Sequence, residues 1–190
     1  MRIGIIELEI HSQTPMAELE ILQLGSPILR QVAAPVAEIQ TPQIQSLLDQ
    51  MLNFSYDRQA MGLAAPQVGH SLQIMIICSH PNHRYPDAPQ IEPLVLINPR
   101  INRHSPTQAT GWEGCLSIPG WRGQVPRHEW VEISFRDRTD QSHHLQLSGF
   151  LARIFQHEYD HLQGSIFLDR LESPSDLYTE AEYFAQLPSL

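Results

Sequence analysis

Apolar and polar positions recur with two different periods along the chain, which predicts both helices and strands. Over residues 42–56 apolar side chains recur at helical spacing, and Thr41 followed by Pro42 is a typical helix start. A second helix is predicted between Ser148, which offers an N-cap, and Gly164, which offers a stop. Four side chains share one face of this second helix: Phe150, Ile154, His157 and His161.

Between the two predicted helices the pattern is that of β-strands. Residues 72–77 and 94–97 are apolar runs, as in buried strands. Apolar and polar side chains alternate over residues 131–136, which is typical of a half-buried strand, and residues 145–147 continue the alternation after a polar turn. This order predicts an α+β fold in which antiparallel or mixed sheets surround the late, C-terminal helix, with the other helix towards the N-terminus. Residues 1–10 are a weaker candidate for a further strand.

Composition narrows the class of protein. The chain has 190 residues, of which 42% are hydrophobic, and it lacks an apolar run of the about 20 residues that a membrane span needs. All 12 basic residues are arginine, against 21 carboxylates, and the net charge of -9 argues against direct nucleic-acid binding. Cys78 and Cys115 are too few for a disulfide framework. We therefore expect a reduced, cytoplasmic protein that binds neither membrane nor nucleic acid.

The sharpest chemical signal is the segment His157-Glu158-Tyr159-Asp160-His161 on the predicted second helix. Histidines four residues apart are neighbours on a helix, so both imidazoles can bind one metal ion, with Glu158 beside its open position as a base. Composition alone would produce such a segment roughly 0.04 times in a chain like this one. The segment therefore predicts a metal site rather than two core histidines.

A third protein ligand must come from elsewhere in the chain. A metzincin pattern would need a histidine where Phe167 stands, and a thermolysin-like pattern would take Glu180 or Glu182 from a later segment. Cys115 is the other candidate, because the adjacent Gly114 lets a ligand or substrate approach the backbone closely. Spacing alone leaves the cysteine and the two glutamates open.

Three segments together resemble, in order and spacing, the signature motifs of peptide deformylase: Gly62-Leu-Ala-Ala-Pro-Gln67, Glu113-Gly-Cys-Leu-Ser117 and Gln156-His-Glu-Tyr-Asp-His161. The resemblance covers about residues 20–172. It leaves residues 1–19 as an N-terminal extension of unknown role, within which Met16 is a second candidate start, and residues 173–190 as a partly helical tail. Ala60 departs from the family, which commonly has a glycine there.

The resemblance implies a metalloenzyme with Cys115, His157 and His161 as the metal ligands. It implies Fe(II) as the metal in the cell, with Ni, Co or Zn able to occupy the site in purified protein. The implied reaction is hydrolysis of the formyl group from formyl-methionyl nascent peptides, which releases formate by metal-hydroxide attack with Glu158 as general base and then acid. The side chain of Gln67 and the backbone N–H of Leu116 would stabilise the oxyanion.

Substrate contacts follow from the same resemblance and from the helix pattern. Gly62 and Gly114, with Met61 beside the first, are expected to lie along an extended peptide. Phe150 and Ile154, on the histidine face of the helix, are the candidates for an apolar pocket that takes the methionine side chain.

The resemblance also implies a structural contact and a set of partners. Arg127 is expected to pair with Glu113 and so to hold the cysteine loop. The expected partners are N-formylmethionyl nascent peptides, with transient proximity to the ribosome, and we expect a monomer.

Two other functions stay open at this point. One is a zincin-type endopeptidase, in which Cys115 plays no part and Glu180 or Glu182 is the third ligand. The other is a non-catalytic relative that binds formylated peptides or docks at the ribosome. The intact motifs around Cys115 and His157 argue against the non-catalytic relative.

Overall fold

Helix α1 (Pro42–Asp57) confirms the first predicted helix and ends one residue beyond it. The Thr41 hydroxyl accepts a hydrogen bond from the backbone N–H of Ile44 (3.4 Å), and Pro42 occupies the first turn, where a missing N–H is tolerated. Leu48 and Met51 have no exposed surface, because the apolar face of α1 packs on the first of the two sheets.

The strands form two antiparallel sheets, and the computed structural model describes residues 19–186, so the strand suggested over residues 1–10 lies outside the described part. The first sheet has the order β1-β2-β3-β6-β7, with strands Gly62–Ala64, Ile74–Ile77, Leu94–His104, Trp130–Arg136 and Ser142–Ser148. The second sheet has the order β4-β5-β8, with strands Gln108–Cys115, Ile118–His128 and Leu177–Thr179.

Most of the predicted strands are confirmed. β2 is fully buried, and β6 alternates between buried and half-buried positions as its sequence pattern indicates. β3 continues seven residues beyond Ile97, where its side chains are largely exposed and carry no apolar signal. β4 gave no signal either, because only Glu113 on it is buried. Its pairing with β5 runs from Gln108↔His128 to Cys115↔Ile118.

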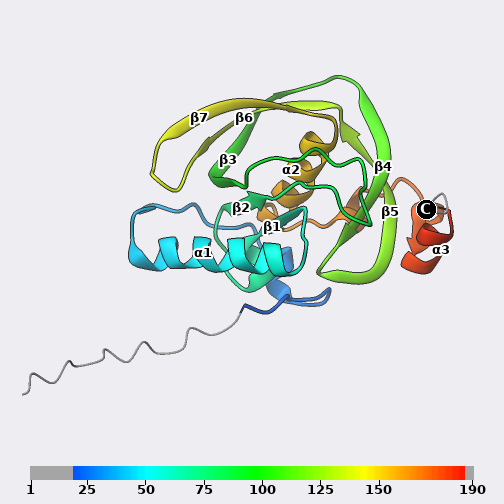
Figure 1. The fold of residues 1–190 in the computed structure, drawn as a ribbon, viewed down its shortest axis with the longest axis horizontal. Coiled ribbons are helices and arrows are strands. Elements are labelled where there is room, and N and C mark those ends of the chain that lie inside the picture. The colour runs from blue at the N-terminus through cyan, green and yellow to red at the C-terminus, as the bar shows by residue number, and fades with distance from the viewer. Residues whose placement is uncertain (1–18, 187–190) are drawn as a thin grey trace, which may run out of the picture.

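Helix α2 (Gly149–Leu162) carries the two histidines and lies between the sheets (Figure 1). Ser148 is its N-cap residue, as predicted, but the Ser148 side chain makes no capping hydrogen bond, which corrects the expectation of a side-chain cap. Phe155 and Leu162 are buried against β2, β3 and β6, so α2 is a core element of the molecule. The predicted α+β class, with sheets around this helix, is confirmed.

Short elements complete the described chain. The 3₁₀ turns are η1 (Pro27–Arg30), η2 (Ala65–Val68), η3 (Phe167–Arg170) and η4 (Pro174–Asp176). Helix α3 (Glu180–Ala185) lies beside β4 and β5, at the end of the molecule away from α1 (Figure 1).

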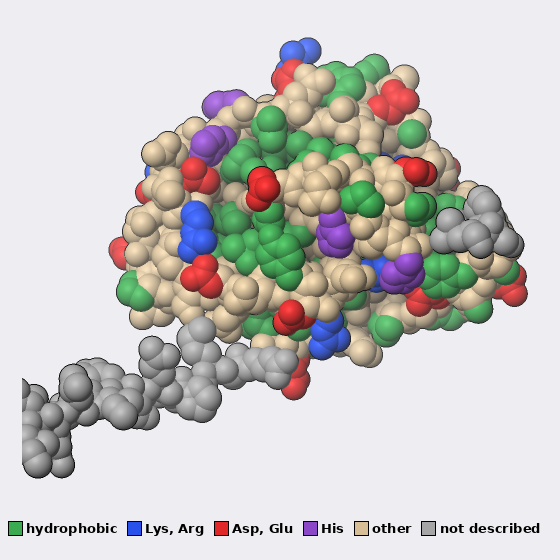
Figure 2. Space-filling model, in the orientation of Figure 1, with side chains coloured by type: hydrophobic (Ala, Val, Ile, Leu, Met, Phe, Trp, Pro, Cys, Tyr) green, Lys and Arg blue, Asp and Glu red, His purple; other side chains and the backbone are tan. Residues whose placement is uncertain are grey.

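Charged side chains are scattered over the surface shown in Figure 2. On the face shown in Figure 2, arginines of the described chain lie singly among scattered carboxylates and do not gather into a basic patch. Between residues 19 and 186, every helix is too short or too polar to cross a membrane.

Candidate metal centre

Three donor atoms converge at one end of α2. His157 and His161 are 8% and 0% exposed, and their ring centroids lie 5.3 Å apart. Cys115, the last residue of β4, places its Sγ 3.3 Å from the Nε2 of His161. The donor atoms of these three residues all lie within 4.8 Å of one another. One metal ion can therefore contact all three.

The chemistry of the three donors fits a transition metal. Burial alone would raise the pKa of the Cys115 thiol, but the charge of His161 and hydrogen bonds from both histidines lower it well below its ordinary value. A thiolate and two imidazoles are donors that Fe(II), Co(II), Ni(II) and Zn(II) all accept. The His157 Nδ1 lies 2.8 Å from a Glu113 carboxylate oxygen, which leaves the Nε2 of this ring available to the metal.

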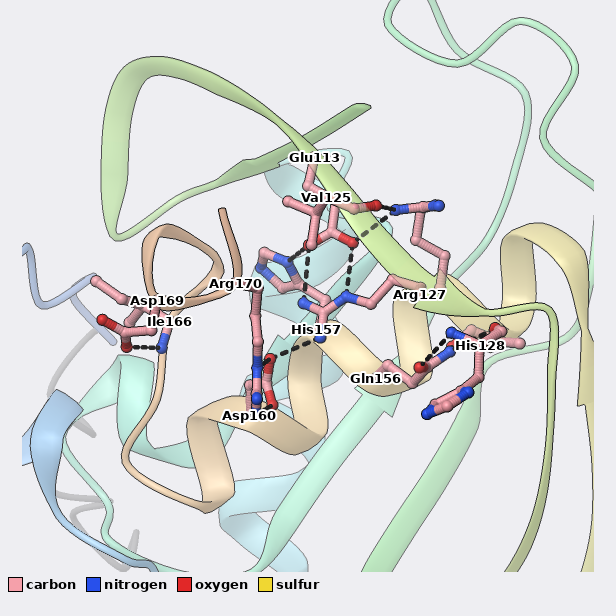
Figure 3. Close-up of polar contacts among 12 residues, drawn as sticks. Glu113, Val125, Arg127, His128, Gln156, His157, Asp160, Ile166, Asp169 and Arg170 are labelled. Carbon is pink, nitrogen blue, oxygen red and sulfur yellow. Dashed lines mark hydrogen bonds and ion pairs between the residues drawn. The ribbon is translucent and has the colours of Figure 1, made fainter. Parts of the chain in front are cut away.

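Glu113 and Asp160 anchor the centre through buried ion pairs (Figure 3). Glu113 accepts hydrogen bonds from the guanidinium of Arg127 at 2.9 and 3.0 Å and from that of Arg153 at 3.0 Å. Arg127 also bonds Asp160 at 2.7 Å, and Asp160 is bonded in turn by Arg170 at 2.6 Å. The predicted pair of Arg127 and Glu113 is confirmed, and it belongs to a network that ties α2 to β4, β5 and η3.

We expect Glu113→Gln to lower the free energy of unfolding of the metal-free protein by about 3 kcal/mol, because it removes the carboxylate of Arg153 and one of the two carboxylates that compensate the buried Arg127. Burial alone would raise the pKa of Glu113, but the charge of Arg127 and hydrogen bonds from His157 and Arg127 hold it below its ordinary value of 4.5. The ionised Glu113 therefore stabilises the fold above pH 4.5, and this contribution is lost as the pH falls below 4.5. Urea denaturation at pH 7 and at lower pH measures both effects.

The matched control is Glu132→Gln, which removes a partly exposed carboxylate 3.4 Å from Arg103. We expect this variant to lose less than about 1 kcal/mol, since exposed ion pairs contribute little. Equal losses in the two variants at pH 7 would contradict a stabilising role for the buried network.

Glu158 lies beside the three donors with one oxygen unpaired. The side chain is 5% exposed, and its Oε2 is buried without a hydrogen-bond partner in the described chain. Burial raises the pKa of Glu158 to about 7. A Cβ atom on Gly62 would lie 2.6 Å from the Glu158 Oε1, so only glycine lets β1 approach this carboxylate so closely. The glutamate is poised to take and return a proton near neutral pH.

A cavity of about 190 Å³ joins these groups, and Gln67 and Leu116 line it. Gln67 is held by its Oε1, which accepts a hydrogen bond from the backbone N–H of Ala64 at 2.8 Å. Its Nε2 consequently points towards the centre and lies 3.4 Å from both the Cys115 Sγ and the Ser117 hydroxyl. A fixed amide donor beside the donor atoms suits a developing negative charge on oxygen.

A smaller cavity of about 50 Å³ lies beside the larger one. It is lined by Phe150 and Ile154, the two residues predicted for an apolar pocket, and by Met61 and Gly114. Phe150 and Ile154 also pack in the core formed by α2 and the first sheet, so each contributes to the cavity wall and to the core. Gly62 and Ala60 line only the larger cavity, whereas Met61 lines both cavities.

Several site residues have no counterpart in the sequence-based prediction. Arg153, Trp112 and Tyr85 line the smaller cavity, and Asp160 anchors the network behind it. The sequence contained a signal for two of them, because Asp160 lies within the histidine motif and Arg153 lies one helical turn before His157. Trp112 directly precedes the Glu113-Gly-Cys-Leu-Ser117 motif, whereas Tyr85 comes from a segment whose pattern gave no hint of the site.

The glutamates considered as a third ligand are elsewhere. Glu180 bonds the Arg122 guanidinium at 2.6 Å, and Glu182 is exposed on α3. Among residues 19–186, the cysteine and the two histidines form the single group of donor atoms close enough to share an ion. The alternative with Glu180 or Glu182 as a metal ligand is therefore wrong.

Comparison with known proteins gives consistent matches. The family model described as polypeptide deformylase matches residues 18–176. Peptide deformylase 2 of Nostoc sp. is 48% identical over 165 residues, which cover 87% of this chain and 92% of the relative. A class I type b peptide deformylase from Acinetobacter baumannii, solved with Met-Ala-Ser bound, has a TM-score of 0.80 at 40% identity, over 82% of this chain and 99% of that one. A peptide deformylase from Synechococcus elongatus, solved with actinonin, has a TM-score of 0.73 at 40% identity, over 83% and 81%.

Proposed function

Because this chain belongs to the peptide deformylase family, we propose that it hydrolyses the formyl group from formyl-methionyl peptides at the centre formed by Cys115, His157 and His161. The observation that carries the proposal is the convergence of these three donors beside Glu158, a buried carboxylate with an unpaired oxygen. A metal ion held by a thiolate and two imidazoles supplies a Lewis acid that activates water near neutral pH.

Glu158 moves the proton in this reaction. Its carboxylate accepts a proton from the attacking water as the new C–O bond forms at the formyl carbon. The same carboxyl group then returns the proton to the peptide nitrogen as the C–N bond breaks, so that formate and a free amine leave. Because the pKa of Glu158 is raised to about 7, this side chain can both accept and donate a proton at neutral pH.

Gln67 and Leu116 stabilise the oxyanion. The Gln67 side chain is oriented by the hydrogen bond from the backbone N–H of Ala64 to its Oε1, and its Nε2 donates to the oxyanion by giving up one of its long bonds to Cys115 and Ser117. The backbone N–H of Leu116, the residue after Cys115, is the second donor, and Leu116 lines the same cavity.

The peptide lies extended along Gly62 and Met61 on one side and Gly114 on the other. The methionine side chain enters the smaller cavity, against Phe150 and Ile154. The relative from Acinetobacter baumannii was solved with Met-Ala-Ser bound, which supports this class of ligand.

The remaining features are proposed from the resemblance to the family and from composition. Fe(II) is the metal in the cell, with Ni, Co or Zn able to take its place in purified protein. The enzyme is a cytoplasmic monomer that meets nascent peptides near the ribosome without binding nucleic acid, in keeping with its net charge of -9. Residues 20–172 form the catalytic unit, residues 173–190 a tail, and residues 1–19 an extension of unknown role.

The test is an anaerobic assay of the Fe(II)- or Ni(II)-loaded protein on formyl-Met-Ala-Ser, with formate and internal peptide-bond cleavage followed in parallel. We expect formate release without internal cleavage. Internal cleavage without formate would favour an endopeptidase. If the fully metallated protein neither releases formate nor cleaves internal peptide bonds, a role in binding formylated peptides would be favoured.

A further inference from the structure

The larger cavity is also lined by charged residues that the proposed reaction does not use. The cavity that contains Glu158 is also lined by Arg84, Arg122 and Glu180. A formylated peptide held at the metal centre must extend its following residues through this cavity, since an extended chain advances about 3.3 Å per residue.

Arg122 of β5 is the buried member of this charged group. It is 5% exposed and lies so close to Gly114 that a Cβ atom there would meet its guanidinium at 2.1 Å. Arg122 donates hydrogen bonds to the Tyr85 hydroxyl at 3.0 Å and to the Glu180 carboxylate at 2.6 Å, while its Nε has no partner in the described chain. The positive charge of Arg122 therefore lies against Gly114, the residue before the metal-ligating Cys115.

Glu180 is brought to this position by a firmly packed segment. β8 pairs with β5, with Trp121 opposite Thr179, and α3 begins directly afterwards at Glu180 (Figure 1). Tyr183 of α3 is 3% exposed and packs against the Arg122 guanidinium, 5.3 Å from the ring centroid. The Tyr183 hydroxyl donates to the backbone oxygen of Arg84 at 3.2 Å, so α3 also holds the loop that carries Arg84.

This segment follows the residues that the family model matches. The match ends at residue 176, whereas β8 and α3 occupy residues 177–185. Glu180 belongs to this C-terminal segment and lines a wall of the larger cavity.

The charge balance at this wall depends on Glu180. Arg84 and Arg122 supply two positive charges, and Glu180, whose side chain is 37% exposed, is the only carboxylate besides Glu158 among the described residues that line the cavity. Fixed charges along a binding groove discriminate between ligands mainly by repelling like charge and attracting opposite charge. Without Glu180 the buried guanidinium of Arg122 would lose the carboxylate that it bonds.

We propose that Glu180 determines charge selectivity for the residues that follow formylmethionine in the substrate. The negative charge of Glu180 offsets the positive charges of Arg122 and Arg84. Peptides with basic residues after the methionine are therefore not repelled, and peptides with acidic residues there are not favoured over them. This inference rests on the proposed deformylase function and adds to it a residue that sets substrate preference.

The experiment compares Glu180→Gln with wild-type enzyme on amidated formyl peptides that carry lysine or glutamate at the second or third position. We expect the ratio of kcat/KM for lysine peptides to that for glutamate peptides to fall by about fivefold at the more sensitive position, as for a partly exposed ion pair. The effect should shrink in high salt, which screens exposed charges. The control is Glu182→Gln, which makes the same change of net charge at an exposed position of α3, two residues away. This variant should leave the ratio unchanged.

The outcomes separate this role from the deformylase function itself. An equal change of kcat/KM on all peptides, or a lysine-to-glutamate ratio that does not change in Glu180→Gln, would overturn the role of Glu180 and leave the deformylase function standing. A wild-type enzyme that releases no formate from any of the peptides would overturn both.

Discussion

Replacing Glu158 by glutamine is expected to lower kcat for formate release by about 10³-fold, since general acid–base groups contribute factors of this order. Glutamine keeps the shape of the side chain but can neither accept the proton of water nor return it to the peptide nitrogen. The side chain is not one of the three converging donors, so metal content should stay at the wild-type level. Steady-state formate release and metal analysis of the same preparations measure both properties.

The control for this variant is Glu38→Gln, which neutralises an exposed carboxylate far from the site in sequence and should retain full activity. More than a tenth of wild-type activity in a fully metallated Glu158→Gln protein would contradict the proton-transfer role. A loss of metal from that variant would instead indicate that Glu158 is itself a ligand.

Replacing Cys115 by serine is expected to weaken metal binding by more than about 100-fold, which exceeds the usual effect of losing a residue that only supports a ligand. The charge of His161 and hydrogen bonds with both histidines lower the pKa of the Cys115 thiol and so favour the thiolate, whereas a serine hydroxyl stays protonated and is a poor donor to Fe(II), Ni(II) or Zn(II). Competition with a chromophoric chelator measures the affinity directly.

Cys78 offers a matched control within the same chain. It is 4% exposed, and burial raises the pKa of its thiol to about 11, as expected for an unreactive core residue. The Cys78→Ser protein should therefore bind metal with wild-type affinity, even if the substitution weakens packing around residue 78. Wild-type metal affinity in Cys115→Ser would contradict the proposed ligand set.

Elements with strong periodicity were predicted well. α1 and α2 have a helical apolar face, and α1 also has capping residues at its start. β6 was predicted because one of its faces is buried and the other is partly open, so its side chains alternate. β4 was missed because it is mostly exposed on both sides, and the start of β7 is exposed in the same way. Such strands are held by backbone pairing, which has no side-chain period.

The site was predictable where its residues are neighbours in the sequence. His157, Glu158 and His161 are placed by the geometry of one helix, and the sequence indicates their chemistry directly. Cys115 was one candidate among several until the resemblance was considered, because 46 residues separate it from His161. Its proximity depends on the β4–β5 pairing and on the packing of α2 between the sheets.

By itself, the sequence determined the α+β class, the two main helices and the metal-binding motif, because these depend on short-range periodicity and on residue types at fixed spacing. The resemblance of the motifs already indicated that Cys115 joins the histidines. Only the tertiary structure decided how Glu113, Arg153 and Asp160 support them together, and that Glu180 lies at the cavity rather than at the metal. The physical reason is that these contacts join segments distant in the chain, and burial and charge pairing select among them only when the whole core has packed.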